Sequence, residues 1–154
     1  MNIRKVKLQN AKDIRSLIIR SVKPEVNPDF DEEGVKLFYQ PNEIPEIRKR
    51  ILNDEYLTLS FNEENKIIGL ITLYKDNKLD QLFVDPAYRK MQISKQLWND
   101  ARDICIKNNS KGEFWVKSST MAIPVYESFG FKLTTGRQQK NGITYYPMVL
   151  KKSN

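Results

Sequence analysis

Residues 82–97 read Leu82-Phe83-Val84-Asp85-Pro86-Ala87-Tyr88-Arg89-Lys90-Met91-Gln92-Ile93-Ser94-Lys95-Gln96-Leu97. An apolar run ends at Val84, the Asp85-Pro86 pair turns the chain, and a helical pattern follows. The apolar residues of that helix recur at helical spacing and are Ile93, Leu97, Ala101, Ile104 and Cys105. A helix begins with unpaired N–H groups and a partial positive charge, so this junction suits a phosphate. Every strand–turn–helix unit has such an end, so the pattern alone permits a phosphate site without specifying one.

The residues before this junction predict consecutive antiparallel strands. Residues 56–61 alternate between apolar and polar side chains, and residues 66–74 are almost continuously apolar. The polar segment 63–65 joins these two strands into a hairpin. A second polar turn, at 75–77, leads into a strand over 79–84.

The N-terminal third predicts one strand and a helical region. Residues 5–8 alternate and predict a short opening strand, and residues 10–20 predict an amphipathic helix that Asn10 can cap. Residues 22–45 contain four prolines around one helical patch at 31–39. A second helix is predicted at 46–52.

The C-terminal part adds a crossover and a hairpin. A strand is predicted at 114–116 and a helix at 122–129. Residues 131–133 and 143–150 then predict a closing hairpin, with a loop that contains Asn141-Gly142.

The predicted order is β–α–α–β–β–β–α–β–α–β–β. Hairpins come first and strand–helix–strand crossovers follow, so we expect an α/β (α+β) fold with a mixed, mostly antiparallel sheet and helices on both faces. The length of 154 residues fits one domain, which we predict to be 1–154.

Composition restricts the chemistry. The chain has no histidine, which excludes a Ser–His triad, a His-ligated metal and an imidazole base. The single cysteine, Cys105, excludes an internal disulfide and a multi-cysteine metal site, and its apolar helix face predicts an inert core residue. We therefore expect no metal, and acid–base chemistry from Asp, Glu, Tyr, Lys, a thiol or water.

The net charge of +7 favours phosphorylated partners through long-range attraction. The Lys and Arg residues are scattered, however, and this favours an ordinary solvated surface over nucleic-acid binding. Residues 1–5 lack the apolar core of a signal peptide, and the longest apolar stretch, 67–73, is too short to span a membrane. These features predict a cytoplasmic protein without a membrane partner.

Residues 84–97 resemble the acetyl-CoA signature of the GCN5-related N-acetyltransferase (GNAT) superfamily. The family pattern runs Val-x-Pro-x-Tyr-Arg-x-x-Gly-x-Gly/Ala-x-x-Leu after the fourth strand. The matching positions here are Val84, Pro86, Tyr88, Arg89, Ile93 and Leu97. Gln92 and Ser94 stand at the two glycine positions, where the family brings the backbone close to the diphosphate.

A second block is similar to the family's Ala-x-x-x-Tyr-x-x-x-Gly-Phe segment on the last helix. It is formed by Ala122, Tyr126, Gly130 and Phe131, and it begins 38 residues after Val84. Ser119 stands where the family often has asparagine. The element order agrees with the family over about residues 2 to 150. The resemblance therefore implies the acyl-CoA N-acyltransferase fold, with strands four and five splayed apart.

The resemblance also implies acetyl-CoA as co-substrate and an amine as acceptor. The pantetheine arm would run along Leu82, Phe83 and Val84, as a missing strand would. The diphosphate would bind the segment Arg89, Lys90, Met91, Gln92, Ile93 and Ser94, and Ser119 would contribute a hydrogen bond.

Two residues are candidates for the chemistry. Tyr126 matches the family's acid position and would protonate the departing CoA thiolate; the other interpretation is a ring that packs on the sheet. Period-two alternation puts Asp80 on the side of Leu82 and Val84, where it could accept the proton of the amine, directly or through water. A strand-end charge that faces solvent is the equal alternative for Asp80.

Further features leave alternatives open. An acidic cluster at a helix start is better explained by the helix dipole than by a role beside the acceptor, and it comprises Asp29, Asp31, Glu32 and Glu33. A non-catalytic GNAT-fold module, with Gln92 weakening the CoA site and a basic surface for nucleic acid, is the second functional hypothesis. The acceptor, a small molecule or a protein, has no readable signal, and a homodimer is possible.

Overall fold

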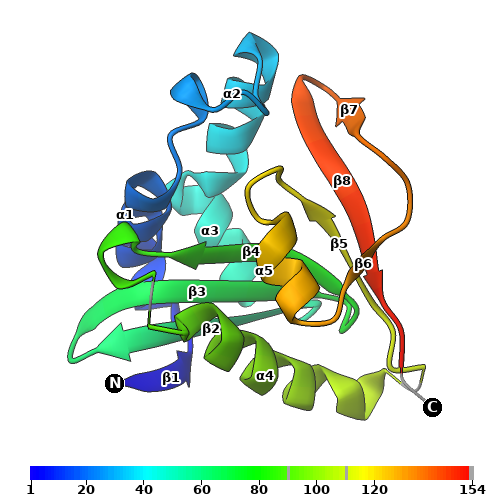
Figure 1. Ribbon diagram of the computed structural model, residues 1–154. Coiled ribbons are helices and arrows are strands. Elements are labelled where there is room, and N and C mark those ends of the chain that lie inside the picture. The colour runs from blue at the N-terminus through cyan, green and yellow to red at the C-terminus, as the bar shows by residue number, and fades with distance from the viewer. Residues whose placement is uncertain (90, 110, 153–154) are drawn as a thin grey trace.

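A computed structural model of the chain describes residues 1–89, 91–109 and 111–152. The strands form a mixed sheet in the order β1-β2-β3-β4-β5-β8-β6, with β7 added on β8 (Figure 1). All neighbouring strands are antiparallel except β4 and β5. The strands are β1 (Asn2–Lys5), β2 (Tyr56–Glu63), β3 (Lys66–Tyr74), β4 (Lys78–Val84), β5 (Phe114–Ser118), β6 (Lys132–Leu133), β7 (Gln138–Lys140) and β8 (Ile143–Leu150).

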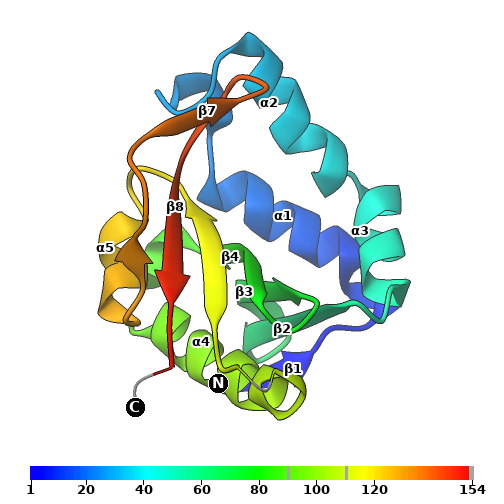
Figure 2. The same ribbon diagram turned by 90° about the vertical axis from the view of Figure 1, so that its right-hand side faces the viewer.

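Helices cover both faces of the sheet. On one face α1 (Ala11–Ser21) and α3 (Ile44–Leu52) pack a core with the β3 side chains of Ile67 and Leu70. On the other face α4 (Ile93–Cys105) and α5 (Ile123–Ser128) pack a larger core. The short α2 (Glu32–Tyr39) lies at the end of the molecule near β7 (Figure 2). The expected α/β fold class is thus confirmed.

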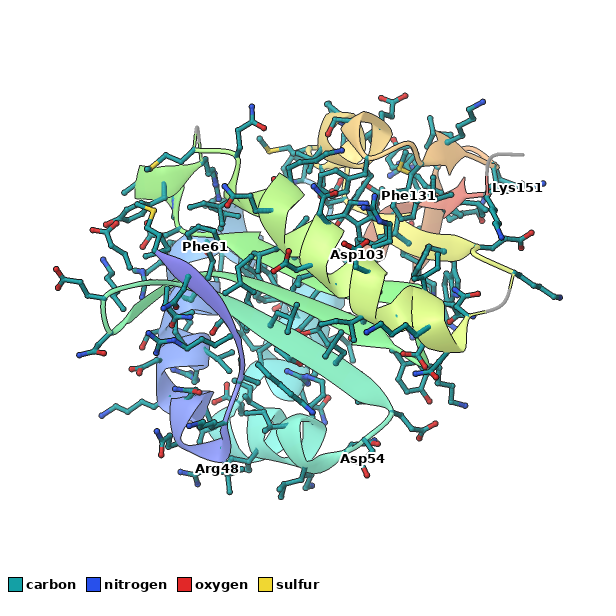
Figure 3. The ribbon with its side chains drawn as sticks, turned by 90° about the horizontal axis from the view of Figure 1, so that it is seen from below. Arg48, Asp54, Phe61, Asp103, Phe131 and Lys151 are labelled. Atoms are coloured by element: carbon teal, nitrogen blue, oxygen red, sulfur yellow. The ribbon has the colours of Figure 1, made fainter. Side chains whose placement is uncertain are left out.

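The larger core is built around Trp98 of α4. Its ring lies 5.1 Å from Phe114, 5.8 Å from Phe129 and 5.4 Å from Phe131, measured between ring centroids. Seen from below, α4 crosses the sheet with Phe61 and Phe131 on either side of it (Figure 3). Gly69 of β3 permits this close approach, because a Cβ atom there would lie 2.8 Å from Cγ2 of Ile93. The first turn of α4 is thereby pressed against the sheet beside the end of β4.

The parallel pair β4–β5 separates after two residues. Pairing joins Lys78 to Trp115 and Leu79 to Val116, and β4 has no further partner on that side among the described residues. Beyond this point the two strands diverge (Figure 1). The splay expected between the fourth and fifth strands is present.

A β-bulge interrupts β4 at Asp80. Leu73 of β3 pairs with Leu79, and Thr72 pairs with Gln81, so Asp80 has no partner on β3. Leu79 and Leu82 both pack in the larger core although they are three residues apart. Strict alternation, which predicts Asp80 on the side of Leu82 and Val84, therefore fails at this residue.

Two strand predictions differ from the structure. The opening strand is Asn2–Lys5, not 5–8, because residues 2–5 pair with β2 whereas Leu8–Asn10 form a turn of 3₁₀ helix. The segment Gln138–Lys140, expected in a loop, pairs with β8 through the two-residue Asn141-Gly142 turn. No helix of the described part of the chain is long and apolar enough to cross a membrane.

Candidate active site

A cleft of about 590 Å³ opens where β4 and β5 diverge. From β4 it is lined by Asp80, Leu82 and Phe83, and from the β5–α5 segment by Ser119 and Tyr126. Five of the residues singled out from the sequence therefore share one cavity, although they come from two segments about 40 residues apart. Val84 and the loop that follows it continue from the same strand beyond the cleft lining.

The free edge of β4 is the first feature that fits acetyl-CoA. From Gln81 to Val84 the main chain pairs with β3 on one side only, within the described residues. A strand edge of this kind offers N–H and C=O groups to an extended ligand. The amide-containing pantetheine arm is such a ligand, and the edge at Leu82, Phe83 and Val84 fits it.

The loop between β4 and α4 is held to α1. The buried Asp85 accepts a hydrogen bond from Ala87 N (3.0 Å) and one from Arg20 Nε (3.0 Å). The Ala87 amide, followed by Arg20 and Lys66, keeps the pKa of Asp85 below its usual value, although burial acts in the opposite direction. Arg89 Nη2 donates to the Ser21 carbonyl at the end of α1 (2.8 Å). The matched arginine of the signature thus fixes the loop to its neighbour.

The start of α4 is the second feature that fits the co-substrate. Gln92 is its N-cap and has φ 59° and ψ 24°, the left-handed conformation that favours glycine. Met91 and Gln92 are exposed, Ile93 is buried, Ser94 is half-buried, and Lys90 lies outside the described residues. The Gln92 side chain makes no capping hydrogen bond. The backbone shape typical of glycine is therefore retained at this position by a glutamine.

Replacement of Gln92 by glycine is expected to stabilise the protein and to tighten CoA binding. A left-handed non-glycine residue costs roughly 1–2 kcal/mol, and the greater chain entropy of glycine offsets part of the gain, which leaves about 0.5–1 kcal/mol. Urea unfolding and CoA calorimetry measure the two effects. The control Gln96→Gly, in the body of α4, should lose about 1 kcal/mol. A Gln92→Gly variant that is less stable, or binds CoA more weakly, contradicts this expectation.

Tyr126, which carries a phenolic hydroxyl group, lines the cleft from α5. Its side chain is buried against Phe129 and Phe131, and burial raises the pKa of the phenol above its ordinary value. No hydrogen bond joins this hydroxyl to another group in the described part of the chain. Ser119 Oγ accepts a hydrogen bond from Ala122 N (3.2 Å) and so supports the beginning of α5. The phenol is neutral and remains available to a ligand.

Asp80 stands among charged neighbours. Its Oδ1 lies 3.3 Å from Lys78 Nζ, and both side chains are about one-quarter exposed. The pKa of Tyr56 is raised by burial and then by the negative charge of Asp80. Asp80 therefore lies in the cleft as a paired, partly exposed carboxylate.

A polar network beside Asp80 had no readable signal in the sequence. Gln81 Nε2 donates to Asn42 Oδ1 (3.0 Å), Thr72 Oγ1 donates to Gln81 Oε1 (3.3 Å), and Asn42 Nδ2 donates to the Phe38 carbonyl (2.7 Å). The network ties β4 to the segment between α2 and α3. A single glutamine and a single asparagine 39 residues apart indicate no such contact until the chain is folded.

The far wall of the cleft joins α2 to the β7–β8 hairpin. The Gly142 carbonyl accepts a hydrogen bond from Asp31 N (2.9 Å), and Asp31 Oδ1 caps α2 by accepting from Gly34 N (2.9 Å). The approach is very close, because a Cβ atom on Gly34 would lie 2.2 Å from the Gly142 carbonyl oxygen. This contact sets the position of the hairpin over the cleft.

Two residues of the acidic cluster, Asp29 and Asp31, form hydrogen bonds that stabilise this wall of the cleft. Both carboxylate oxygens of Asp29 accept hydrogen bonds from Thr120, from its amide (2.8 Å) and its hydroxyl (2.6 Å). Asp31 caps α2, and Glu32 and Glu33 lie exposed in its first turn. Only Asp29 of the four lines the cleft. The helix start accounts for Asp31, Glu32 and Glu33, as expected, whereas Asp29 differs because it binds Thr120 and lines the cleft.

A Gly34→Ala variant is expected to move the hairpin away from α2. Overpacking of this kind costs about 1–3 kcal/mol. We expect KM for the acceptor to rise several-fold while KM for acetyl-CoA is unchanged, because the wall lies away from the β4–α4 loop. Gly136→Ala is the matched control, since a Cβ atom there meets nothing within 4 Å. Equal acceptor KM values for the two variants would refute the role of this contact.

The splayed sheet, the free β4 edge and the α4 N-terminus define an acyl-CoA N-acyltransferase fold. A profile described as an acetyltransferase (GNAT) domain matches residues 26–152. The chain belongs to the GNAT acetyltransferase family and is an acyltransferase. No curated protein matches the sequence.

Solved structures share the fold at low sequence identity. The PaiA N-acetyltransferase of Thermoplasma acidophilum, solved with coenzyme A, is 19% identical with a TM-score of 0.82, covering 98% of both chains. A GCN5-related N-acetyltransferase of Rhodopseudomonas palustris is 17% identical with a TM-score of 0.81, covering 97% of this chain and 94% of the other. The ribosomal-protein-S18-alanine N-acetyltransferase of Escherichia coli is 18% identical with a TM-score of 0.65, covering 97% and 92%.

Proposed function

We propose that the protein transfers the acetyl group of acetyl-CoA to a primary amine by direct attack, without a covalent enzyme intermediate. The observation that carries this proposal is the shared cleft, which is lined by the free edge of β4 and by the residues Tyr126 and Asp80. Holding two substrates in one geometry is the main source of rate in such a transfer.

Binding of the co-substrate is assigned to two segments. The main chain of Leu82, Phe83 and Val84 would pair with the pantetheine arm, and the backbone from Arg89 to Ser94 would hold the diphosphate at the start of α4. The exposed side chain of Gln92 supports this assignment, because it leaves the inner side of the loop to the backbone.

The proton balance assigns roles to two side chains. An amine has a pKa of about 10 and must lose a proton before its nitrogen attacks the thioester carbonyl. Asp80 would take that first proton through an ordered water, and the free amine then attacks so that the new C–N bond forms. The C–S bond then breaks, and Tyr126 would donate its hydroxyl proton to the departing thiolate. The second proton on the attacking nitrogen leaves as the amide forms and, through water, restores the Tyr126 phenol.

The cleft volume favours a small-molecule acceptor. Sites for small molecules usually measure about 300–1,000 Å³, and the cleft lies within that range. A protein acceptor would insert a single side chain or its N-terminus, which needs less enclosed space.

Two measurements test the proposed function. Calorimetry should detect CoA binding, and a thiol-release assay with a panel of primary amines should detect transfer. Absence of CoA binding at millimolar concentration overturns the proposal, and so does turnover of hydroxyl acceptors alone. Binding of a short DNA duplex in place of CoA would favour the non-catalytic module.

A further inference from the structure

Four charged side chains line the cleft, and of these only Asp80 has a role in the proposed reaction. They are Asp29, Asp80, Lys117 and Lys140. The two carboxylates are already engaged, Asp29 by Thr120 and Asp80 by Lys78. Neither Lys117 nor Lys140 forms an ion pair with a carboxylate in the part of the chain that the structure describes. The cleft therefore holds two lysines that form no ion pair within the described residues, while its two carboxylates already have hydrogen-bond or ion-pair partners.

Lys117 is held in place on β5. Its Nζ lies 5.1 Å from the centroid of the Tyr145 ring, and Tyr145 also lines the cleft. Partial burial, followed by the charges of Lys78 and Lys140, lowers the pKa of Lys117, while Asp80 acts in the opposite direction. The positive charges of the two lysines thus repel each other, and an anion bound beside them would reduce this repulsion.

Lys140 reaches the same cavity from another element. It ends β7 and pairs with Ile143 across the Asn141-Gly142 turn. The contact between Gly142 and α2 fixes this hairpin over the cleft. The two cations therefore stand on separate strands at the acceptor end, away from the α4 N-terminus that suits the diphosphate.

We propose that the acceptor is an amine that also carries an anionic group, a carboxylate or a phosphate, and that Lys117 and Lys140 bind this group. The inference rests on the proposed acetyl transfer. It makes the cleft complementary to a dipolar molecule, with the amine at Asp80 and the anion at the lysine pair. A polyamine would instead bring positive charge against two lysines, which disfavours it.

Matched acceptors test the proposal in the wild-type protein. The pairs are β-alanine with β-alaninamide and phosphoethanolamine with ethanolamine, and spermidine represents the polycations. In at least one pair we expect the anionic member to have a kcat/KM about tenfold higher or more, since hydrogen bonds to charged groups add that much. Comparison of the two pairs distinguishes a carboxylate from a phosphate. Equal kcat/KM within both pairs, or a preference for spermidine, overturns the proposal.

Variants assign the effect to the lysines. Lys117→Gln and Lys140→Gln should each raise KM for the anionic acceptor about tenfold, with KM for acetyl-CoA unchanged. The doubly reversed variant, with Lys117→Glu and Lys140→Glu, should prefer spermidine. Lys12→Gln, at an exposed position of α1, is the control and should leave both KM values unchanged. A rise in KM for acetyl-CoA, with the acceptor KM unchanged, overturns the assignment.

Calorimetry separates this inference from the proposed function. If no amine is acetylated, the proposed function fails, and binding of β-alanine and phosphoethanolamine to the CoA-loaded protein is then measured directly. Binding of either compound that Lys117→Gln abolishes supports the anion site on its own. Absence of binding by both compounds overturns it.

Discussion

Tyr126→Phe is expected to lower kcat for acetyl transfer by about 100-fold, at the lower end of the range for general acid catalysis. The substitution removes only the hydroxyl. The ring keeps its contacts with Phe129 and Phe131, so the variant should fold and bind CoA as the wild type does. Steady-state kinetics with one acetyl acceptor and CoA calorimetry measure the two properties. Tyr74→Phe, which removes a hydroxyl at the end of β3, is the control.

The pH dependence of kcat is a second test of the role of Tyr126. Burial raises the pKa of the Tyr126 phenol above its ordinary value of 10.0, so its acid form persists through and beyond neutral pH. Burial disfavours a phenolate, and it equally disfavours a thiolate beside it. The pKa values of the two groups therefore rise together, and burial does not oppose proton transfer from the phenol to the thiolate. We expect no loss of kcat through ionisation of Tyr126 below pH 10. Full kcat in Tyr126→Phe would show that the tyrosine is structural.

Asp80→Asn is expected to lower kcat/KM by roughly 10–100-fold, because the amide cannot accept the proton of the acceptor ammonium group. The shape of the side chain is retained, and the ion pair with Lys78 is lost. The pH–rate profile is the decisive measurement, since loss of a base displaces the rising limb toward the pKa of the free amine. Thermal unfolding should change little, because exposed ion pairs contribute about 0–1 kcal/mol.

A matched variant distinguishes the loss of a catalytic base from the loss of one negative charge. Asp54→Asn removes one exposed carboxylate outside the cleft and should leave the profile unchanged. If Asp80→Asn has an unchanged profile and kcat/KM, Asp80 is a strand-end charge, the alternative that its sequence position permits.

Cys105 provides a case in which the sequence was sufficient. Its place on the apolar face of a helix predicts a core residue, and the structure buries it completely in the α4 core. Burial raises the pKa of the thiol to about 12, so the thiolate is absent at neutral pH. The prediction of a core residue is confirmed.

Elements with strong periodicity were also predictable. Residues 66–74, 93–105 and 143–150 form the expected strand, helix and strand, because their side chains repeat with the period of the element they form. Residues 2–5 and 138–140 were missed, since each is a short strand whose pairing partner determines it. Short segments of this kind carry too few residues to display a period.

Local sequence patterns were sufficient for most of the order of strands and helices, with the strand at 138–140 as an exception, for the signature between β4 and α4, and for the absence of histidine chemistry. These properties depend on neighbouring residues, and local spacing is sufficient to encode them. Three features became evident from the folded chain alone: Asp80 lies in a bulge, Arg89 binds the end of α1, and Lys117 and Lys140 share a cleft. Each of these joins residues distant along the chain or depends on the register between strands. Packing of the whole sheet sets such contacts, and no pattern within one segment contains them.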